Sequence, residues 1–269
     1  MPHRWDPDHY LSYAGERARP FVDLLARVGA QEPGVVVDLG CGPGHLTRLL
    51  AERWPEARVT GLDSSPEMIA AARDGDGPVR FDVGDLRDWV ATAREQSVDV
   101  LVSNATLQWV PGHLDLLPAL VAAVAPGGWL AFQVPGNVDQ PSHAIRAELA
   151  AEAPYAEHTA GVATPDAHDG VTYLRALASL GCTVDAWETT YLHVLQGEDP
   201  VLAWVSGTGA GPTLQALEDA DPALRAQFEE EFGRRLRAAY PQEPHGVVLP
   251  FRRVFVVARR SARREGGRA

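Results

Sequence analysis

Short apolar runs rich in β-branched residues alternate with helical stretches between Val35 and Pro135. Buried strands of a parallel sheet have this composition, because helices cover both faces of such a sheet. The pattern predicts strands at Val35–Leu39, Arg58–Leu62, Val79–Val83, Val98–Val102 and Trp129–Val134. It predicts helices between them, at Gly44–Arg53, Pro66–Arg73, Leu86–Ala93 and His113–Val124.

This alternation ends after Pro135, and longer elements follow. We expect helices at Ser142–Ala151 and Tyr173–Leu180, a long strand at Cys182–Val194, a glycine-punctuated helical insertion at Pro200–Tyr240 and a last strand at Val247–Ala258. Two long strands joined by an insertion late in an α/β chain indicate an antiparallel edge of the sheet. The insertion would then fold over the carboxyl ends of the strands, where α/β proteins bind ligands.

Together these elements predict an α/β fold: a Rossmann-like, doubly wound, mostly parallel seven-stranded sheet with an antiparallel last strand and helical cap insertions. We expect a single domain over residues 1–269, because 45% hydrophobic residues over this length can bury a full core. Its expected parts are an N-terminal helical arm at 1–33, a cofactor-binding core at 34–135, cap segments at 136–181 and 195–246, and a basic flexible tail at 259–269.

Composition and charge restrict the partners of the chain. No stretch approaches the roughly 18 apolar residues of a membrane span. No apolar segment follows Arg4 as in a signal peptide, so we expect a cytoplasmic protein without a membrane partner. The formal net charge of −12 would repel nucleic acid, and no nucleic-acid partner is expected. We interpret the basic run Arg259–Arg268 as a solvated tail, with an RNA-binding arm as its alternative.

The absence of lysine and the small number of cysteines exclude some kinds of catalysis and of structural cross-link. Every basic side chain apart from histidine is arginine, which excludes a lysine Schiff base. The two cysteines, Cys41 and Cys182, belong to no CxxC or Cys/His cluster. We therefore expect neither a metal site nor a disulfide.

The sharpest motif is a glycine-rich turn, Gly40-Cys-Gly-Pro-Gly44, between the first predicted strand and helix. Glycines this close allow a tight bend and let a ligand approach the backbone without interference from Cβ atoms. Amides at the start of the following helix point into such a site. A dinucleotide fingerprint would place its third glycine or alanine at position 45, but this chain has His45 there and Gly44 before it. The spacing favours S-adenosyl-L-methionine (AdoMet) over NAD.

Polar side chains follow the next predicted strands. Asp63 ends the second strand, where a carboxylate can accept hydrogen bonds from two ribose hydroxyls. Asp85 and Leu86 follow the third strand and suit an adenine amino group and its ring face. A polar and aromatic stretch, Ser103–Val110, follows the fourth strand at the position facing a transferable group. An aspartate at one strand end is often only a helix cap, but the conjunction of these features predicts an AdoMet site.

The expected cofactor-binding residues lie at these strand ends. They are Asp38, Gly40, Cys41, Gly42, Gly44, Asp63, Ser64, Asp85, Leu86, Asn104 and Ala105. We interpret Cys41 as a small residue that fits the turn and not as a nucleophile. The product formed from AdoMet would be S-adenosyl-L-homocysteine.

The glycine turn and strand ends resemble those of class I AdoMet methyltransferases, and nearly the whole chain resembles the trans-aconitate 2-methyltransferase family. The stretches that carry the second resemblance are Trp5–Tyr10, Arg17–Pro20, Val37–Gly44, Gly61–Pro66, Ser103–Trp109, Gly181–Tyr191 and Phe251–Arg259. Matches outside the cofactor turn separate this family from other methyltransferases. The resemblance implies methylation of a carboxylate of a small polycarboxylic acid, trans-aconitate, to a monomethyl ester.

One cap position departs from the family pattern. Family members can carry an arginine just before the proline of the segment Thr208–Pro212, where this chain has Gly211. If that arginine clamps a substrate carboxylate, the resemblance implies a different preferred acid for this chain.

The implied reaction needs no general base, because a carboxylate with a pKa of about 4 is already ionised at neutral pH. The protein can act by holding oxygen, methyl and sulfur in line and by excluding water. We expect Tyr10, Gln108 and Trp109 to form the catalytic centre, because they fall in the matched stretches. Ordinary core or lid packing is the alternative for these side chains.

An anionic substrate that enters a chain of net charge −12 needs a local cationic clamp, and the arginine fork matches a carboxylate. The expected substrate-binding residues are Arg17, Arg19, His143, Arg146, Tyr191, His193 and Arg253, with Arg252 as an alternative to Arg253. A surface ion pair or a solvated charge is the other interpretation of each cationic side chain.

Other functions stay open on these observations. One is a methyltransferase that acts on an oxygen or carbon of a different acid or natural product. A second is a nicotinamide-dependent oxidoreductase, and a third is a non-catalytic AdoMet-binding module. The sequence is compatible with a monomer or a homodimer.

Overall fold

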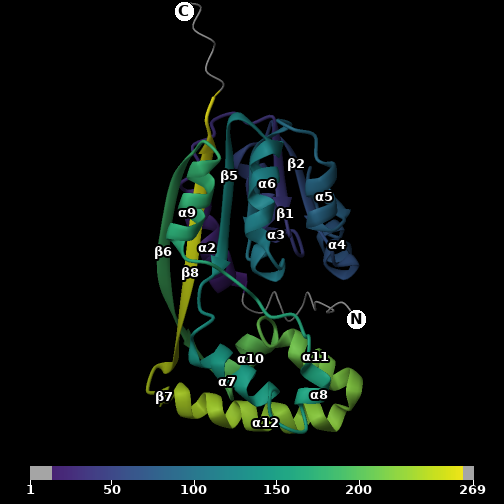
Figure 1. The fold of residues 1–269 in the computed structure, drawn as a ribbon, viewed down its shortest axis with the longest axis vertical. Coiled ribbons are helices and arrows are strands. Elements are labelled where there is room, and N and C mark those ends of the chain that lie inside the picture. The colour runs from purple at the N-terminus through teal and green to yellow at the C-terminus, as the bar shows by residue number, and fades with distance from the viewer. Residues whose placement is uncertain (1–13, 263–269) are drawn as a thin grey trace, which may run out of the picture.

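The computed structural model describes residues 14–262, which form a sheet covered by helices and a helical cap at one end of it (Figure 1). The strands are β1 (Val35–Leu39), β2 (Arg58–Asp63), β3 (Arg80–Val83), β4 (Val98–Asn104), β5 (Val124–Pro135), β6 (Cys182–Leu195), β7 (Gln242–Glu243) and β8 (Gly246–Arg260). Their order is β3-β2-β1-β4-β5-β8-β6, and β7 pairs with β8. Strands β1 to β5 pair in parallel, whereas β8 runs antiparallel to both β5 and β6. The predicted α/β fold with a mostly parallel sheet and an antiparallel edge is confirmed.

The structure differs from the predicted elements at several places, and the unpredicted short helices at Leu107–Trp109 and Ala156–Thr159 are among them. The two-residue strand β7 adds an eighth strand to the predicted seven, counted over residues 14–262. Strand β5 begins at Val124 and not at Trp129, because Val124 already pairs with Val98 of β4. The register shifts before Trp129 pairs with Val100, and Gly127 in the shifted segment has a φ of +81°. The predicted helix His113–Val124 divides into a 3₁₀ helix, η2 (His113–Leu116), and α6 (Leu117–Ala123), with a proline in the first turn of α6.

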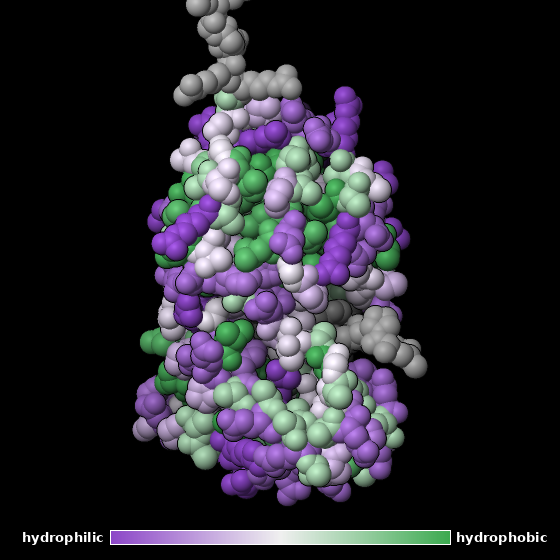
Figure 2. Space-filling view, in the orientation of Figure 1, coloured by the Kyte–Doolittle hydropathy of each residue, from purple (hydrophilic) through white to green (hydrophobic). Residues whose placement is uncertain are grey.

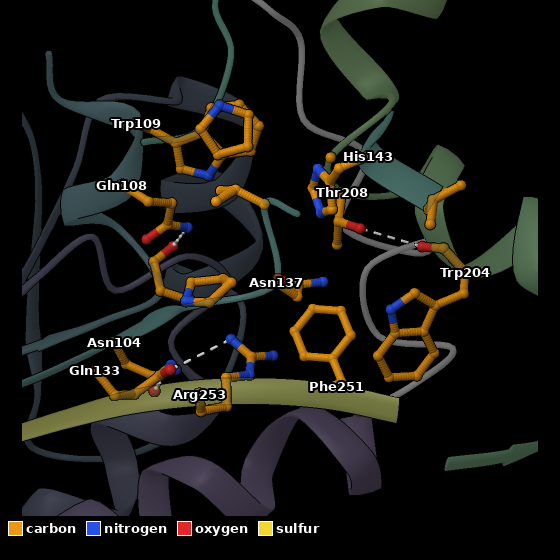
Figure 3. Close-up of a pocket in the computed structure, with 16 residues that line it drawn as sticks. Asn104, Gln108, Trp109, Gln133, Asn137, His143, Trp204, Thr208, Phe251 and Arg253 are labelled. Carbon is orange, nitrogen blue, oxygen red and sulfur yellow. Dashed lines mark hydrogen bonds between the residues drawn. The ribbon is translucent and has the colours of Figure 1, made fainter. Parts of the chain in front are cut away.

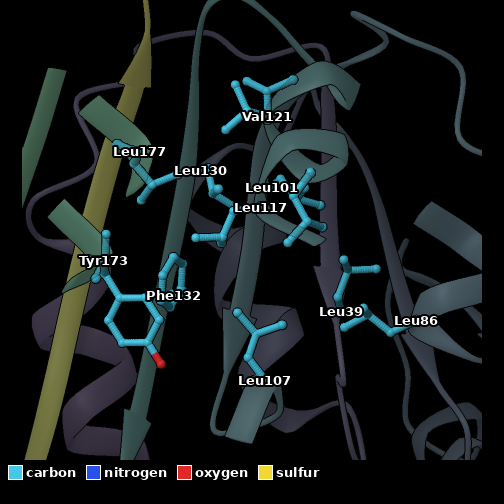
Figure 4. Packing of buried hydrophobic residues seen from close by; sticks show 14 of the residues in the cluster. Leu39, Leu86, Leu101, Leu107, Leu117, Val121, Leu130, Phe132, Tyr173 and Leu177 are labelled. Atoms are coloured by element: carbon cyan, nitrogen blue, oxygen red, sulfur yellow. The ribbon is translucent and has the colours of Figure 1, made fainter. Parts of the chain in front are cut away.

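Helices cover both faces of the sheet because strand side chains alternate between them. Helices α2 (Ala14–Leu25) and α3 (His45–Arg53) pack with Val36 of β1 on one face. On the other face, α5 (Leu86–Thr92), α6 and α9 (Gly170–Ser179) pack with Val37 (Figure 4). Helix α4 (Pro66–Arg73) packs against Phe81 of β3. The carboxyl ends of β1 to β4 are thereby held at one level, facing the cap (Figure 1).

The cap has its own apolar core. It consists of α7 (Pro141–Ala150), α8 (Ala156–Thr159), α10 (Pro200–Ser206), α11 (Gly211–Ala220) and α12 (Pro222–Ala239). Trp204, Phe228 and Phe232 are buried within it, and the far ends of β6 and β8 contribute Leu195 and Phe251 to the same cluster. The long paired strands therefore tie the cap to the sheet. Hydrophilic side chains dominate the lower rim of the cap in Figure 2.

Residues 14–262 include no helix with both the length and the apolar character needed to cross a membrane. The longest helix in this part of the chain, α12, carries charged side chains along its exposed surface. Helix α9 lies within the segment 136–181, yet it packs on β6 and β8 and not within the cap.

Replacing Phe132 by alanine tests the importance of the sheet core. The Phe132 side chain is 0% exposed and packs edge to face on Tyr173, with ring centroids 5.1 Å apart. Because the substitution leaves a cavity, we expect Phe132→Ala to lower the free energy of unfolding by about 3–5 kcal/mol in urea denaturation. The matched control is Leu192→Ala on β6, where the side chain is 65% exposed and the expected change is within about 0.5 kcal/mol. Equal changes in the two variants would contradict this description of the core.

Candidate active site

A cavity of about 740 Å³ opens where the carboxyl ends of the parallel strands face the cap. This volume lies in the range of pockets that hold small molecules and cofactors. Its lining comes from the segments after β1, β2, β3 and β4 together with two residues beyond the sheet, and includes Gly40, Gly42, Asp63, Ser64, Gly84, Asp85, Leu86, Asn104, Ala105, Thr106, Trp109, Ala163 and Pro212. The cavity therefore lies where open α/β sheets bind ligands.

The glycine turn needs its glycines for two different reasons. All three have positive φ, at +79° for Gly40, +54° for Gly42 and +76° for Gly44. A Cβ on Gly40 would lie 1.9 Å from Thr106 Oγ1, and one on Gly44 would lie 2.6 Å from the Phe81 ring, so close packing excludes side chains there. A Cβ on Gly42 would meet no atom of residues 14–262 within 4 Å, and Gly42 lines the cavity. Gly42 thus leaves the room that a ligand of the cavity needs.

Asp63 joins the glycine turn to the start of α4. Its Oδ2 accepts the Gly42 N–H at 2.9 Å and its Oδ1 accepts the Ser65 N–H at 2.9 Å. Ser65 in turn caps α4, with its hydroxyl oxygen accepting the Met68 N–H. Burial raises the pKa of Asp63, and the backbone N–H groups of Ser65, Gly42 and Ser64 oppose that rise. The carboxylate lines the cavity in a fixed orientation, with lone pairs available for hydroxyl donors.

Three of the expected cofactor-binding residues, which lie in β1 or in the turn itself, do not line the cavity. They are Asp38, Cys41 and Gly44. Asp38 is fully buried and accepts the Thr47 hydroxyl at 2.7 Å. Cys41 lies against Gly61, and burial is the first cause that raises the pKa of its thiol, which makes it a poor nucleophile.

The other expected residues line the cavity. Asp85 caps α5 by accepting the Arg87 N–H at 2.7 Å, as the cap interpretation expects, and it also lines the cavity. Leu86 lies beside it with its side chain buried. Ala105 has a positive φ of +54°, and its N–H donates to the Gln133 carbonyl at 2.9 Å. A non-glycine residue in this conformation is a strained position of the kind that concentrates at functional sites.

A second pocket adjoins the first, and the two share Asn104, Ala105 and Trp109. Its remaining lining comes from the segment after β4, from β5, from the cap and its neighbouring loops, and from β8. It includes Gln108, Gln133, Pro135, Asn137, Val138, His143, Pro165, Trp204, Val205, Thr208, Gly209, Phe251 and Arg253 (Figure 3). Gln108 Nε2 donates to the Ala105 carbonyl at 2.6 Å. The expected catalytic residues Gln108 and Trp109 therefore lie at or next to the junction of the two pockets, whereas Tyr10 falls outside the described residues.

Successive side chains of β8 point to opposite faces of the sheet, so only one of its two adjacent arginines, Arg252 and Arg253, can face the second pocket. Arg253 is buried and lines the second pocket, and its guanidinium lies 4.5 Å from the centroid of the Phe251 ring. Arg252 points to the opposite face, where it forms a two-pronged ion pair with Glu188 at 2.8 and 2.9 Å. Arg253 is thus the cation of β8 that a ligand in the pocket would meet.

His143 and Arg146 lie on α7 at the cap side. His143 lines the second pocket, and burial, followed by the charge of Arg146, lowers its pKa to about 4. Its imidazole is therefore neutral at pH 7 and offers one N–H donor and one acceptor. Arg146 is buried behind it and donates to Thr213 Oγ1 at 2.9 Å. The structure does not place Arg146 among the lining residues of either pocket.

Of the other expected substrate-binding residues, Arg19, Tyr191 and His193 line neither pocket. Tyr191 donates its hydroxyl to Asp23 Oδ2 at 2.6 Å, and the guanidinium of Arg19 lies 4.9 Å from the centroid of its ring. His193 packs on Trp204 with ring centroids 4.6 Å apart. The side chain of Arg17 is outside what the structure describes.

Several lining residues were absent from the sequence prediction. They are Thr106, Gln133, Asn137, Trp204, Thr208 and Phe251. Gln133 carried a usable signal, because it is a polar residue at the carboxyl end of an otherwise apolar predicted strand. Trp204 and Thr208 carried none, because their place depends on how the cap docks. Within residues 14–262, no group of three or more His, Cys, Asp or Glu side chains is placed to hold a metal ion.

Comparison with known proteins identifies the class. A family model described as a methyltransferase domain matches residues 10–186. Among solved structures, geranyl diphosphate C-methyltransferase from Streptomyces coelicolor A3(2) has a TM-score of 0.51 at 18% identity, covering 90% of this chain and 77% of that one. Phosphoethanolamine N-methyltransferase 2 from Haemonchus contortus, solved with S-adenosylhomocysteine, has a TM-score of 0.58 at 14% identity, covering 95% of this chain and 57% of that larger one. The class is that of AdoMet-dependent methyltransferases with a Rossmann-like fold.

Curated relatives narrow the class to a family. Trans-aconitate 2-methyltransferase of Streptomyces avermitilis is 53% identical over 268 residues, covering 96% of this chain and 97% of the relative. The protein of the same name from Mycobacterium tuberculosis H37Ra is 47% identical over 272 residues, covering 98% of this chain and 100% of the relative. This chain belongs to the trans-aconitate 2-methyltransferase family.

Asp38 gives the stability of the protein a defined dependence on pH. Burial raises the pKa of Asp38 from 3.8 to about 7, the Thr47 hydroxyl opposes the rise, and Asp63 adds to it. Because the folded protein keeps this proton to higher pH than the unfolded chain does, Asp38 makes the free energy of unfolding fall as pH rises from about 4 to about 7. Asp38→Asn retains an acceptor for Thr47 and cannot ionise.

We therefore expect the variant to gain stability relative to the wild type by about 1–4 kcal/mol across this range, measured by urea denaturation without cofactor. A difference between the two proteins that is constant with pH, or that shrinks as pH rises, would show that Asp38 does not carry the proton.

Proposed function

We propose that this chain transfers the methyl group of AdoMet to a carboxylate oxygen of trans-aconitate, giving a monomethyl ester and S-adenosyl-L-homocysteine. The observation that carries the proposal is the junction of the two pockets at Asn104, Ala105 and Trp109. One pocket has the lining and volume for a nucleoside, and the other contains a buried arginine and several amides that suit a carboxylate. Curated relatives that match almost the full chain carry the corresponding name.

In the proposed complex, the larger cavity holds AdoMet. Asp63 accepts the ribose hydroxyls, Asp85 accepts the adenine amino group, and Leu86 contacts the ring face. Open space at Gly42 and the fixed orientation of the Asp63 carboxylate both support this placement. Asn104, Ala105 and Trp109 then lie beside the group to be transferred.

The smaller pocket holds the acid. Arg253 supplies the buried positive charge, and Gln108, Asn137 and His143 supply neutral polar groups around it. The Oδ1 of Asn137 and the Oε1 of Gln108 are buried and have no hydrogen-bond partner within residues 14–262, so both amides have capacity for a ligand. A protein with a net charge of −12 needs such a local site to bind a polycarboxylate.

The reaction proposed here is an in-line displacement. Bound AdoMet supplies an electrophilic methyl carbon, the carboxylate oxygen forms the new bond to it, and the electron pair of the breaking carbon–sulfur bond stays on sulfur. The residues of the chain orient the acid and exclude water, and no side chain has to remove a proton. A neutral His143 accords with this scheme, since its pKa of about 4 leaves it un-ionised at neutral pH.

We further propose that residues 1–269 act as one unit, in which 34–135 binds the cofactor and the cap segments within 136–181 and 195–246 complete the acid pocket. We propose a cytoplasmic location, and the net charge of −12 supports an enzyme that does not bind nucleic acid. A monomer or a homodimer would satisfy this arrangement.

A turnover assay tests the proposal. Purified protein is incubated with AdoMet and a panel of di- and tricarboxylic acids together with neutral phenols, and products are identified by mass spectrometry. We expect a monomethyl ester from trans-aconitate, formed in equal amount to S-adenosyl-L-homocysteine. Methylation of a phenol and of no acid would contradict the proposed substrate. Binding of AdoMet without transfer to any acceptor would contradict catalysis.

Gly42→Val tests the placement of the cofactor. The valine side chain would occupy the open space in the larger cavity, so we expect calorimetric titration to detect no binding of AdoMet. Gly181→Val is the matched control, because Gly181 has a φ of +80°, faces no atom of the described residues within 4 Å and lines neither pocket. In both variants valine must adopt a left-handed backbone conformation, which lowers the stability of the fold by about 1–2 kcal/mol. Thermal denaturation measures this loss of stability. AdoMet affinity of the wild-type level in Gly42→Val would refute the placement.

A further inference from the structure

Three polar side chains form a continuous row along one wall of the second pocket (Figure 3). Arg253 Nη1 donates to Gln133 Oε1 at 3.3 Å, and Gln133 Nε2 donates to Asn104 Oδ1 at 2.7 Å. Gln133 is 1% exposed and Arg253 is buried as well. The row starts on β8, crosses β5 and ends on β4, which are neighbours in the sheet.

Arg253, at one end of the row, fixes the donor and the acceptor of both hydrogen bonds. A guanidinium has donors only, so the group of Gln133 that faces Arg253 must be its carbonyl oxygen. The amide nitrogen of Gln133 then faces Asn104, which must accept with its own oxygen. The usual ambiguity between the oxygen and the nitrogen of a side-chain amide is thereby removed at both residues.

The NH₂ group of Asn104 is the free end of the row. Its oxygen is engaged by Gln133, and its Nδ2 has no hydrogen bond to another residue of the described range 14–262. Asn104 lines both pockets, whereas Arg253 and Gln133 line only the second one. A pair of N–H donors therefore faces the region where the acceptor and the methyl group would meet.

We propose that Gln133 is a positioning residue which, held by Arg253, aims the Asn104 NH₂ group at the carboxylate oxygen that becomes methylated. This inference rests on the proposed function. The distal part of the same acid lies against Arg253, so one hydrogen-bonded row contacts the substrate at two places. Two donor groups at a fixed separation select an acid whose carboxylates have the matching separation.

A carboxylate could also come from the methionine part of AdoMet. The row favours the acid, because two of its three members belong to the acid pocket alone. The two sources predict different behaviour when Gln133 is changed, since one alters binding of the acid and the other alters binding of AdoMet.

Gln133→Glu reverses the direction of the hydrogen bond between residue 133 and Asn104. A carboxylate only accepts, so the new side chain keeps the contact with Arg253 and forces Asn104 to donate its NH₂ to it. Asn104 then presents its oxygen to the acid. Gln133→Met removes both hydrogen bonds at similar volume and leaves Asn104 able to turn either way. Gln227→Glu, on the exposed surface of α12, controls for one added negative charge.

For full-length wild type and each variant, the experiment measures the dissociation constant of trans-aconitate with the protein saturated with S-adenosyl-L-homocysteine. It also measures the dissociation constant of AdoMet, the steady-state KM and kcat for the acid, and the Tm. We expect acid binding to weaken in the order wild type, Gln133→Met, Gln133→Glu, with about a tenfold or larger loss in Gln133→Glu. AdoMet binding should stay within about twofold of the wild type, and Gln227→Glu should match the wild type throughout. The Tm should follow a different order, with Gln133→Met below Gln133→Glu, because only methionine removes the oxygen that accepts the hydrogen bond of Arg253 Nη1.

Several outcomes would overturn the inference. An acid affinity that follows the order of Tm would assign Gln133 a structural role, and an equal loss of AdoMet affinity would assign the Asn104 donors to the cofactor. Unchanged acid binding in Gln133→Glu would exclude the row from recognition. If the wild type binds trans-aconitate but forms no ester, the proposed function fails while the order of dissociation constants still decides the role of Gln133. If the wild type does not bind trans-aconitate, both proposals fail.

Discussion

The carboxylate of Asp63 is the constraint on which the geometry of the site depends. Its two oxygens accept the N–H groups of Gly42 and Ser65, so one side chain fixes the glycine turn after β1 and the helix start after β2. The parallel register that aligns Leu39 with Leu62 brings these two segments to the same level of the sheet. Burial of this anion is unfavourable, and the backbone N–H groups that surround it offset part of that cost. The larger cavity takes its shape from this arrangement.

The second pocket depends on the cap, and the cap depends on the two long strands that carry it. Strands β6 and β8 pair from Cys182 with Arg260 to Leu195 with Val247, and their far ends pack in the core of the cap. This rigid connection holds His143 of α7 and Trp204 of α10 opposite Arg253. A site built on paired strands keeps its groups in register better than one built on loops. In-line transfer, which works by orientation, benefits from that rigidity.

The sequence predicted most of the strand-end residues that line the larger cavity, for a physical reason. Gly42, Asp63, Asp85 and Asn104 each fall within a few residues of a predicted strand end, and parallel strands bring such ends together. The lining of the second pocket was harder to predict. Arg253 and Arg252 are adjacent in sequence, and only the sheet shows which one faces the pocket and which one pairs with Glu188. Tyr191 and His193 have suitable chemistry but face the packed interior, and Trp204 and Thr208 reach the pocket only through the docking of the cap.

Calorimetric titration of wild-type protein and Asp63→Ala with AdoMet tests the central claim most directly. If the Asp63 carboxylate holds both the glycine turn and the ribose hydroxyls, affinity falls by about 1–3 kcal/mol, or roughly 5-fold to 150-fold, in a variant that still unfolds cooperatively. An affinity equal to that of the wild type would contradict the account, because AdoMet would then bind away from the carboxyl ends of β1 and β2.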